Sequence, residues 1–295
     1  VSNPEFLREG EAIRDFSYPD RVIIGTDSKK ANRILKSLYL PIIKKTSRYF
    51  NTSRRGAELI KYASNAFLAT KISFINEMAN LCEKTSIDVK DISLGMGSDQ
   101  RIGDRFLRAG PAYGGSCFPK DTRAIVDTAS SFKSNLSIIK SVIKSNNERK
   151  LLLTKRVEKI FNNKIKNKNI TFLGVTFKPN TDDMREAPSI ELINKLHSKG
   201  VNIHAYDPVA IKEAKIIFKD IPIKYKKNKE DCLKNADALV IVTEWNDFKN
   251  PDFEKISNLM KTPIIFDGRN LLNTQKMKSH SIEYYPIGKP KLVNI

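Results

Sequence analysis

Residues 236–245 read ADALVIVTEW, and this run decides how the second half of the chain folds. An unbroken series of apolar and β-branched residues predicts a strand, and a short helix from Glu230 is expected before it. A helix at 253–261 and a strand at 263–268 follow. Upstream, the pattern predicts strands at 169–174 and 201–208, with a helix at 188–200 that ends at Gly200.

Strands that alternate with helices are typical of a doubly wound parallel sheet. We therefore expect a Rossmann-like domain over residues 163–295, opened by the polar segment 163–169. Such sheets bind ligands at the carboxyl ends of their strands. The residues expected at those ends are Gly174 to Lys178, Asp207, Glu244 and Asp267 to Arg269.

The first half of the chain predicts a different organisation within the same α/β class. Residues 1–51 are expected to be the C-terminal remnant of a Rossmann domain, with a strand at 21–26 and a helix at 29–42. No earlier strand completes a sheet, so we expect a partial sequence. Residues 52–162 predict a central helical domain. Its longest helix, at 52–84, is expected from the helical spacing of Ile60, Ala63, Phe67, Ile75, Met78 and Cys82.

The charge of the sequence indicates which partners to expect. The 295 residues include 52 lysines and arginines against 33 acidic residues, a formal net charge of +19. This excess is typical of a solvated lysine-rich surface, or of a field that attracts anions. No nucleic-acid-binding motif occurs and the lysines are spread along the chain. We therefore expect phosphorylated small molecules as partners, and no nucleic acid.

The numbers and positions of cysteines and histidines indicate the cellular compartment and whether a metal is expected. Three cysteines in so long a chain are too few for a disulfide framework, which favours a reducing compartment, the cytoplasm. The three histidines are scattered, so no metal is expected, and His204 is expected to be structural. No apolar run reaches the ~18 residues of a membrane span, so no membrane association is expected.

The stretch AYGGSCFPKD (112–121) places a cysteine in a tight and charged setting. A cysteine attacks as its thiolate, which neighbouring cations favour, and Lys120 lies three residues on. Gly114 and Gly115 would let the backbone approach a bulky ligand. Asp121 could position a water or accept a proton. On spacing alone, Cys117 is either a nucleophile or a loop cysteine without a chemical role.

Six motifs in a fixed order change that balance. Together they resemble the UDP-glucose/GDP-mannose dehydrogenase family, over nearly the whole chain, and the first of them favours UDP-glucose. The motifs are NPEFLREG (3–10), KYASNAFLATKISFINE (61–77), GSDQRIG (97–103), FLRAGPAYGGSCFPKD (106–121), GVTFKPNTDDMREAPS (174–189) and FDGRN (266–270).

The resemblance implies an NAD-dependent, four-electron oxidation of UDP-glucose to UDP-glucuronate through a cysteine thiohemiacetal and thioester. Related oxidations of GDP-mannose or a UDP-N-acetylhexosamine are the alternatives, as is a UDP-sugar-binding fragment without catalysis. The sequence departs from the family in one respect, because it contains no G-x-G-x-x-G at a strand-to-helix turn. We therefore expect the chain to be inactive alone.

The resemblance also implies roles for individual residues. Cys117 matches the nucleophile, Lys61 and Asn65 the donors to the oxyanion, Asp121 the residue that positions water, and Glu5 a base. Arg101 matches an arginine supplied to the neighbouring subunit, which implies a homodimer. The substrate-binding residues are expected to be Glu5, Phe6, Leu7, Arg8, Glu9, Lys61, Asn65, Arg101, Arg108, Tyr113, Gly114, Lys178 and Arg269, and the cofactor-binding residues Glu9, Cys117, Lys120 and Arg185.

Overall fold

A computed structural model describes residues 1–43 and 48–290. The chain forms two compact units. Unit 1 comprises Val1–Leu68 and Lys120–Leu136, and unit 2 comprises Ala69–Pro119 and Ser137–Ile295. The expected domain boundaries after residues 51 and 162 stay a prediction. Residues 44–47 of the expected first domain and 291–295 of the expected third lie outside the described residues.

Unit 1 contains a small parallel sheet. Its strands β1 (Arg21–Gly25) and β2 (Arg48–Thr52) pair with Arg21 opposite Arg48. Helix α2 (Lys29–Tyr39) is preceded by Ser28, whose hydroxyl accepts a hydrogen bond from the N–H of Ala31 and so caps the helix. The sequence predicted β1 and α2, but not β2 or the short helix α1 (Ala12–Ser17).

Two helices contribute residues to both units. Helix α3 spans Arg54–Thr85, close to the predicted 52–84, and α5 spans Phe118–Ser131. On α3 the predicted apolar positions differ in exposure, since Ile75 is fully buried whereas Phe67 is 65% exposed. The helical period therefore predicted the helix, but not which of its apolar positions are covered.

Unit 2 is built on a six-stranded parallel sheet in the order β5-β4-β3-β6-β7-β8. This confirms the predicted doubly wound sheet. The chain leaves β3 towards one edge and later returns to build the other edge from β6, so the strand order reverses between β3 and β6. The strands are β3 (Asn169–Leu173), β4 (Asn202–Tyr206), β5 (Lys224–Tyr225), β6 (Ala238–Ile241), β7 (Ile264–Asp267) and β8 (Glu283–Pro286).

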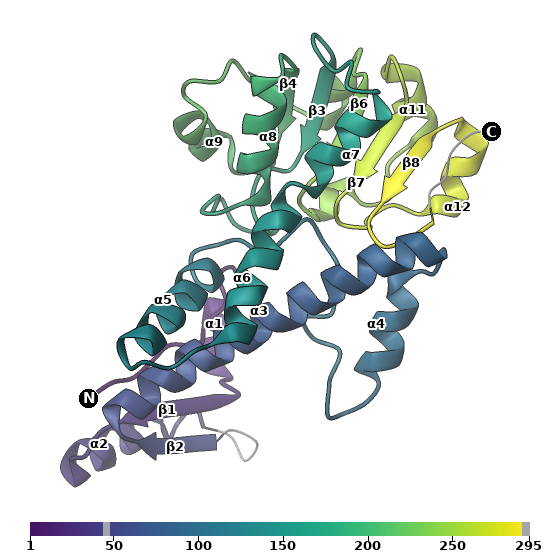
Figure 1. Cartoon of the computed structure of the whole chain (residues 1–295). Helices are drawn as coiled ribbons and strands as arrows, with labels where there is room; N and C mark the ends of the chain where they lie inside the picture. Colours follow the sequence, from purple (N-terminus) through teal and green to yellow (C-terminus); the bar gives the residue numbers. More distant parts are fainter. Residues whose placement is uncertain (44–47, 291–295) are drawn as a thin grey trace. The chain divides into compact units, whose positions relative to one another are not determined.

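Helices cover both faces of this sheet (Figure 1). Side chains alternate along each strand, so Phe172 lies in one hydrophobic cluster with α7, α8 and α9, while Leu173 lies in a second with α10 and α11. Because helices cover both faces of the sheet, the side chains on both sides of a strand such as β6 are apolar, and its sequence is an unbroken apolar run. The helices of unit 2 are α4 (Val89–Gly97), α6 (Ser137–Lys150), α7 (Leu152–Ile160), α8 (Pro188–Ser198), α9 (Ile211–Ile217), α10 (Lys229–Leu233), α11 (Phe253–Leu259) and α12 (Thr274–Met277), with short 3-10 turns at Asn246–Phe248 and Lys278–His280.

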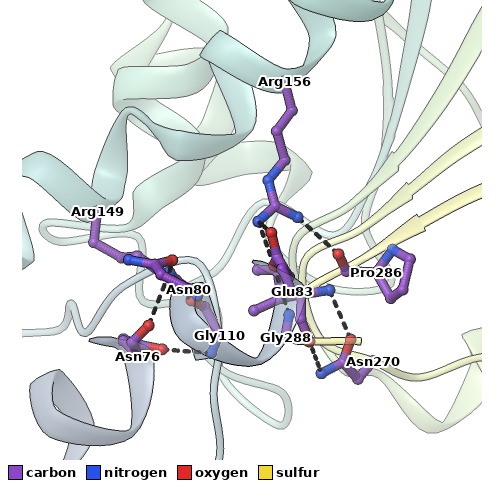
Figure 2. Close-up of polar contacts among 10 residues, drawn as sticks. Asn76, Asn80, Glu83, Gly110, Arg149, Arg156, Asn270, Pro286 and Gly288 are labelled. Atoms are coloured by element: carbon purple, nitrogen blue, oxygen red, sulfur yellow. Dashed lines mark hydrogen bonds and ion pairs between the residues drawn. The ribbon is translucent and has the colours of Figure 1, made fainter. Parts of the chain in front are cut away.

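A polar staple joins the end of α3 to the last strand of the sheet (Figure 2). Arg156 on α7 donates to the Glu83 carboxylate at 2.7 Å and to the carbonyl of Pro286 at 2.7 Å. The N–H of Gly288 donates to the same carboxylate at 2.6 Å. A glycine is required there, because a Cβ would lie 2.7 Å from side-chain atoms of Ala79 and Val89.

Candidate active site

In unit 1, the structure brings together the predicted polar residues of α3 and α5. Asn65 donates to the Asp121 carboxylate at 2.6 Å, and both side chains are buried, at 7% and 2% exposure. The Lys120 ammonium lies 3.6 Å from the other oxygen of Asp121. Lys61, one turn before Asn65 and so on the same helix face, lies 3.9 Å from the Glu5 carboxylate.

The segment 3–10 is organised around Phe6. The guanidinium carbon of Arg21 lies 4.1 Å from the Phe6 ring centroid, and the Lys61 ammonium lies 5.2 Å from it. Two cations on one aromatic ring fix the ring beside the Lys61 side chain. Leu7 is adjacent, and its N–H donates to Glu5 at 2.9 Å.

Arg8 is held by carboxylates of its own segment. Its backbone N–H and its guanidinium both donate to Asp15, and the guanidinium also pairs with Glu11 at 2.6 Å. The Asp15 hydrogen bond raises the pKa of Arg8 and, in return, lowers the pKa of Asp15. A ligand that took the backbone N–H groups of Leu7 and Arg8 would have to replace these bonds. Glu9 is exposed.

In unit 2, residues 106–117 form the cysteine loop, and its two glycines approach the chain itself. A Cβ on Gly114 would lie 2.4 Å from the carbonyl oxygen of Glu186, and one on Gly115 would lie 2.8 Å from the Phe177 ring. Gly115 also has a φ of +82°, which favours glycine. The expectation that these glycines let the backbone approach a ligand stays a prediction, and the structure shows another use for them. They let the loop pack against the segment that follows β3.

Three buried polar side chains, which sequence reasoning missed, hold the cysteine loop from α3 and α6. Asn76 accepts from the N–H of Gly110 at 2.8 Å, and Arg149 donates to the Gly110 carbonyl at 2.9 Å (Figure 2). Asn146 bonds both the N–H and the carbonyl of Tyr113, at 2.9 and 3.1 Å. Burial lowers the pKa of Arg149 to about 10. The sequence signal that could have indicated them is a polar residue at a helix position where the apolar pattern predicts burial.

Cys117 stands at the end of this loop, directly before α5. It is half-buried and not in a disulfide, and its Sγ lies 3.6 Å from the Ser116 hydroxyl. The other cysteines, Cys82 and Cys232, are buried in the hydrophobic clusters, where burial raises the pKa of both thiols. Cys117 is therefore the only accessible thiol of the described part of the chain.

Arg269 joins three carboxyl-end loops of the sheet. Its guanidinium donates to the carbonyls of Phe177 and Val242, at 2.6 and 2.7 Å, and forms an ion pair with Glu244 at 2.9 Å. A Cβ on Gly110 would lie 3.2 Å from this guanidinium, so the cysteine loop packs against Arg269 as well. The Lys178 ammonium lies 5.1 Å from the Phe177 ring centroid. The cysteine loop and the cations Lys178 and Arg269 therefore lie together at the carboxyl edge of the sheet.

Two predicted acidic residues at this edge are committed to the fold. Asp207 accepts from the N–H groups of Val175 and Ala210 and from the Trp245 indole. Asp267 is fully buried and accepts from backbone N–H groups and from the Tyr284 hydroxyl at 2.8 Å. Neither carboxylate is left for a ligand. Glu244, Arg269 and Lys178 carry the remaining charges there.

The other predicted cations lie at the surface. The Arg185 side chain is 65% exposed and pairs with Asp183, and the Arg101 side chain is 89% exposed and pairs with Asp99. Arg108 is exposed. In the described ranges 1–43 and 48–290, no three His, Cys, Asp or Glu side chains are placed to hold a metal, and no helix is long and apolar enough to cross a membrane.

Comparison with known proteins identifies the family. Three models of the UDP-glucose/GDP-mannose dehydrogenase family match: the NAD binding domain over residues 1–43, the central domain over 55–148 and the UDP binding domain over 171–274. The chain belongs to the UDP-glucose/GDP-mannose dehydrogenase family. The resemblance seen in the six motifs is thereby confirmed.

Relatives with curated names and a solved structure support the same family. The chain is 45% identical over 288 residues to the UDP-glucose 6-dehydrogenase of Rickettsia prowazekii and 46% identical over 295 residues to that of Bacillus subtilis. These matches cover 98% and 99% of the chain, and the chain spans 66% of the length of each relative. A UDP-glucose dehydrogenase from Pyrobaculum islandicum superposes with a TM-score of 0.88 at 33% identity, over 98% of this chain and 63% of that one.

Proposed function

We propose that this chain provides the nucleophile and the nucleotide-sugar-binding residues of an NAD-dependent dehydrogenase that oxidises UDP-glucose to UDP-glucuronate. One observation carries the proposal. The loop that ends in the accessible Cys117 packs, through Gly110, Gly114 and Gly115, against the carboxyl edge of a sheet that matches the family's UDP binding domain. Parallel sheets bind nucleotides at that edge. A thiol beside a nucleotide site suits covalent chemistry on the attached sugar.

The chemistry assigned to Cys117 follows from the reaction. Loss of a hydride from C6 and of the hydroxyl proton converts the C6 alcohol to an aldehyde. Addition of the thiolate to the carbonyl carbon, with a proton taken up by the oxygen, gives a thiohemiacetal. Loss of a second hydride from C6 and of that hydroxyl proton gives a thioester. Water then cleaves the C–S bond, which releases the carboxylate and restores the thiol. The aldehyde is therefore held on the enzyme throughout.

Residues of unit 1 are assigned to the charges that develop. The Lys61 ammonium and the Asn65 amide would donate to the oxyanion. Asp121, held by Asn65 at 2.6 Å, would position the water that cleaves the thioester, and Glu5 would accept its proton. The Asn65–Asp121 pair is buried, so its geometry is fixed before a substrate binds. Phe6, Leu7 and Arg8 would contact the sugar nucleotide through their backbone.

The diphosphate and the cofactor are assigned to cations. Lys178 and Arg269 would bind the nucleotide, with Arg108, Tyr113 and Gly114 in the loop that covers it. Two NAD molecules, bound in turn, would supply one hydride acceptor each. Lys120 and Arg185 offer positive charge for its diphosphate and Glu9 a neighbouring carboxylate, although none of them lies in a glycine-rich turn. Arg101 is assigned to the substrate of a second subunit in a homodimer, a role its exposed side chain permits.

The test is Cys117→Ser in protein expressed from the complete coding region, with Ser116→Ala as the matched control. Absorbance at 340 nm follows NADH, and mass spectrometry follows UDP-glucuronate. We expect Cys117→Ser to abolish UDP-glucuronate formation and to retain UDP-glucose binding, while Ser116→Ala stays within a few-fold of wild type. Turnover of Cys117→Ser at the wild-type rate would exclude the nucleophile assignment.

A substrate panel separates the alternatives. GDP-mannose or a UDP-N-acetylhexosamine oxidised faster than UDP-glucose would assign a related dehydrogenase. Binding of UDP-sugar without NADH formation from any of them would assign a binding module without catalysis. The match to relatives that are themselves named UDP-glucose 6-dehydrogenases favours UDP-glucose.

A further inference from the structure

A polar cavity lies in unit 2, away from the carboxyl edge of the sheet. Its volume is about 520 Å³. Its walls come from β4, from β5 and the residues after it, and from α10 and the turn that follows. The side chains that matter for its chemistry are His204, Lys224, Lys226, Lys227, Asp231 and Lys234.

The sheet register places this cavity on the α10 face. His204 pairs with Lys224 on one side and with Thr171 on the other, so the three side chains lie on the same face. The Thr171 hydroxyl donates to the carbonyl of Cys232 at 2.6 Å, which fixes α10 over that face. Asn169, the first residue of β3, and Asn235, which precedes β6, also line the cavity, so it lies towards the amino ends of these two strands. Arg269 follows the carboxyl end of β7 and belongs to the opposite edge.

The charges around the cavity are unbalanced. Four lysines face one carboxylate, and that carboxylate, Asp231, already pairs with Lys234 at 2.7 Å. Lys224, Lys226 and Lys227 have no ion-pair partner within 4 Å among residues 1–43 and 48–290. Several like charges around one cavity repel each other, and an anion relieves that repulsion.

His204 supplies a second, independent indication of a ligand. It is only 7% exposed and lines the cavity, yet neither ring nitrogen has a hydrogen-bond partner among the described residues. A buried polar group without a partner is unfavourable, and native structures nearly always satisfy it. Burial, with Lys226 and Lys224 beside the ring, lowers the pKa of His204. A ligand with acceptor oxygens would satisfy the imidazole and neutralise the lysines.

We propose that this cavity is a second anion site, which binds a small molecule that carries at least two phosphate groups. The site is separate from the nucleotide-sugar site proposed above. A nucleic acid is disfavoured, because the lysines surround a cavity instead of following an extended face. Tyr225 also lines the cavity, but its side chain alternates with that of Lys224, packs against the core cluster and lies 5.9 Å from the Lys215 ammonium, so its ring is not presented for base stacking.

The test uses inorganic pyrophosphate and the imidazole NMR signals of the full chain. The sequence has three histidines, His197, His204 and His280, so the signals can be assigned by substitution. Every titration is made in an Arg269→Gln background, which weakens the carboxyl-edge site. We expect a saturable shift of the His204 signal and a raised His204 pKa in the bound state. An unchanged His204 signal at saturating pyrophosphate would overturn the proposal.

Matched charge variants locate the site. Lys224→Gln with Lys226→Gln should weaken pyrophosphate binding about tenfold or more, because each removes a full charge from the cavity wall. Lys195→Gln with Lys212→Gln is the control, since these exposed residues lie on α8 and α9, on the other face of the sheet. Equal losses for the two pairs would overturn the site and assign binding to overall charge.

Two further ligands decide the class. UDP that shifts the His204 signal where pyrophosphate does not would show that the base is required, and would overturn a site for phosphate groups alone. A single-stranded oligonucleotide that displaces pyrophosphate at lower concentration would assign nucleic acid instead. Displacement of pyrophosphate by other compounds with two phosphate groups, and none by inorganic sulfate at equal concentration, is the expected result.

Discussion

At the scale of single residues, the packing of the cysteine loop depends on two glycines. Gly114 and Gly115 have no Cβ, and this allows the backbone to lie against Glu186 and Phe177. The N–H of Gly115 then donates to the carbonyl of Arg185 at 2.8 Å. The position of Cys117 is therefore set by backbone packing two and three residues before it.

We predict that Gly114→Ala displaces the loop and destabilises the fold by about 1–3 kcal/mol, because its Cβ would lie 2.4 Å from a carbonyl oxygen. Gly95→Ala is the matched control. Gly95 lies within α4 with nothing inside 4 Å of its would-be Cβ, so alanine should stabilise that helix by up to about 1 kcal/mol. Urea denaturation measures both. The same sign for the two variants would contradict the packing argument.

We also predict that Lys61→Ala slows hydride transfer by roughly 10²–10³-fold, the typical effect of removing one oxyanion donor. Pre-steady-state NADH formation in protein from the complete coding region is the measurement. Lys84→Ala, an exposed lysine of the same helix, should leave the rate unchanged. A Lys61→Ala rate within tenfold of wild type would exclude the oxyanion role and leave Lys61 as a structural residue beside Phe6.

Candidate site residues that stand in motifs could be predicted from the sequence, whereas the buried polar residues that hold the cysteine loop could not. Cys117, Lys61 and Asp121 stand in recognisable motifs, so they could be named in advance. Arg149 and Asn146 bond backbone groups of Gly110 and Tyr113, more than 30 residues away in the chain. No local pattern encodes such a bond, because it exists only once the helices have packed.

At the scale of elements, the length of a helix or strand decided whether the sequence could predict it. The 32-residue helix α3 and strands such as β6, with every residue buried, produce long and consistent patterns. Strand β5 has two residues, and its side chains are half-buried or exposed, so it has no hydrophobic run. It is added to the sheet by pairing with β4, which is a tertiary event.

The staple between α3, α7 and β8 gives a prediction at this scale. Arg156→Met should destabilise the fold by about 1.5–3 kcal/mol, because Glu83 is only 20% exposed in its side chain and would lose its cation. Arg156→Met with Glu83→Gln should recover part of the loss, since the unpaired charge is gone. Chemical denaturation of the four proteins of this cycle provides the test. Full additivity would show that the two side chains do not interact.

At the scale of the whole molecule, the net charge of +19 acts through a few local groupings of cations. Two of them lie in unit 2 at opposite ends of one parallel sheet, around Arg269 and around His204. The strand order predicted the first, since nucleotides bind at carboxyl ends. It could not predict the second, because that cavity depends on how α10 and β5 cover an edge.

Calorimetry on the purified chain separates the two groupings. UDP should bind with a dissociation constant in the millimolar range or lower, because Lys178, Arg269 and the cysteine loop are all present. NAD should give no saturable heat in the Lys224→Gln, Lys226→Gln variant, in which the amino-end cavity is weakened, since the sequence lacks the glycine-rich strand-to-helix turn that cradles a dinucleotide diphosphate. In the same variant, Arg269→Gln should weaken the remaining UDP binding about tenfold by removing a desolvated cation. If Lys226→Gln abolished UDP binding and Arg269→Gln left it intact, the nucleotide would belong at the amino-end cavity. Saturable NAD binding in the variant without the two cavity lysines would mean that residues 1–43 suffice for the cofactor.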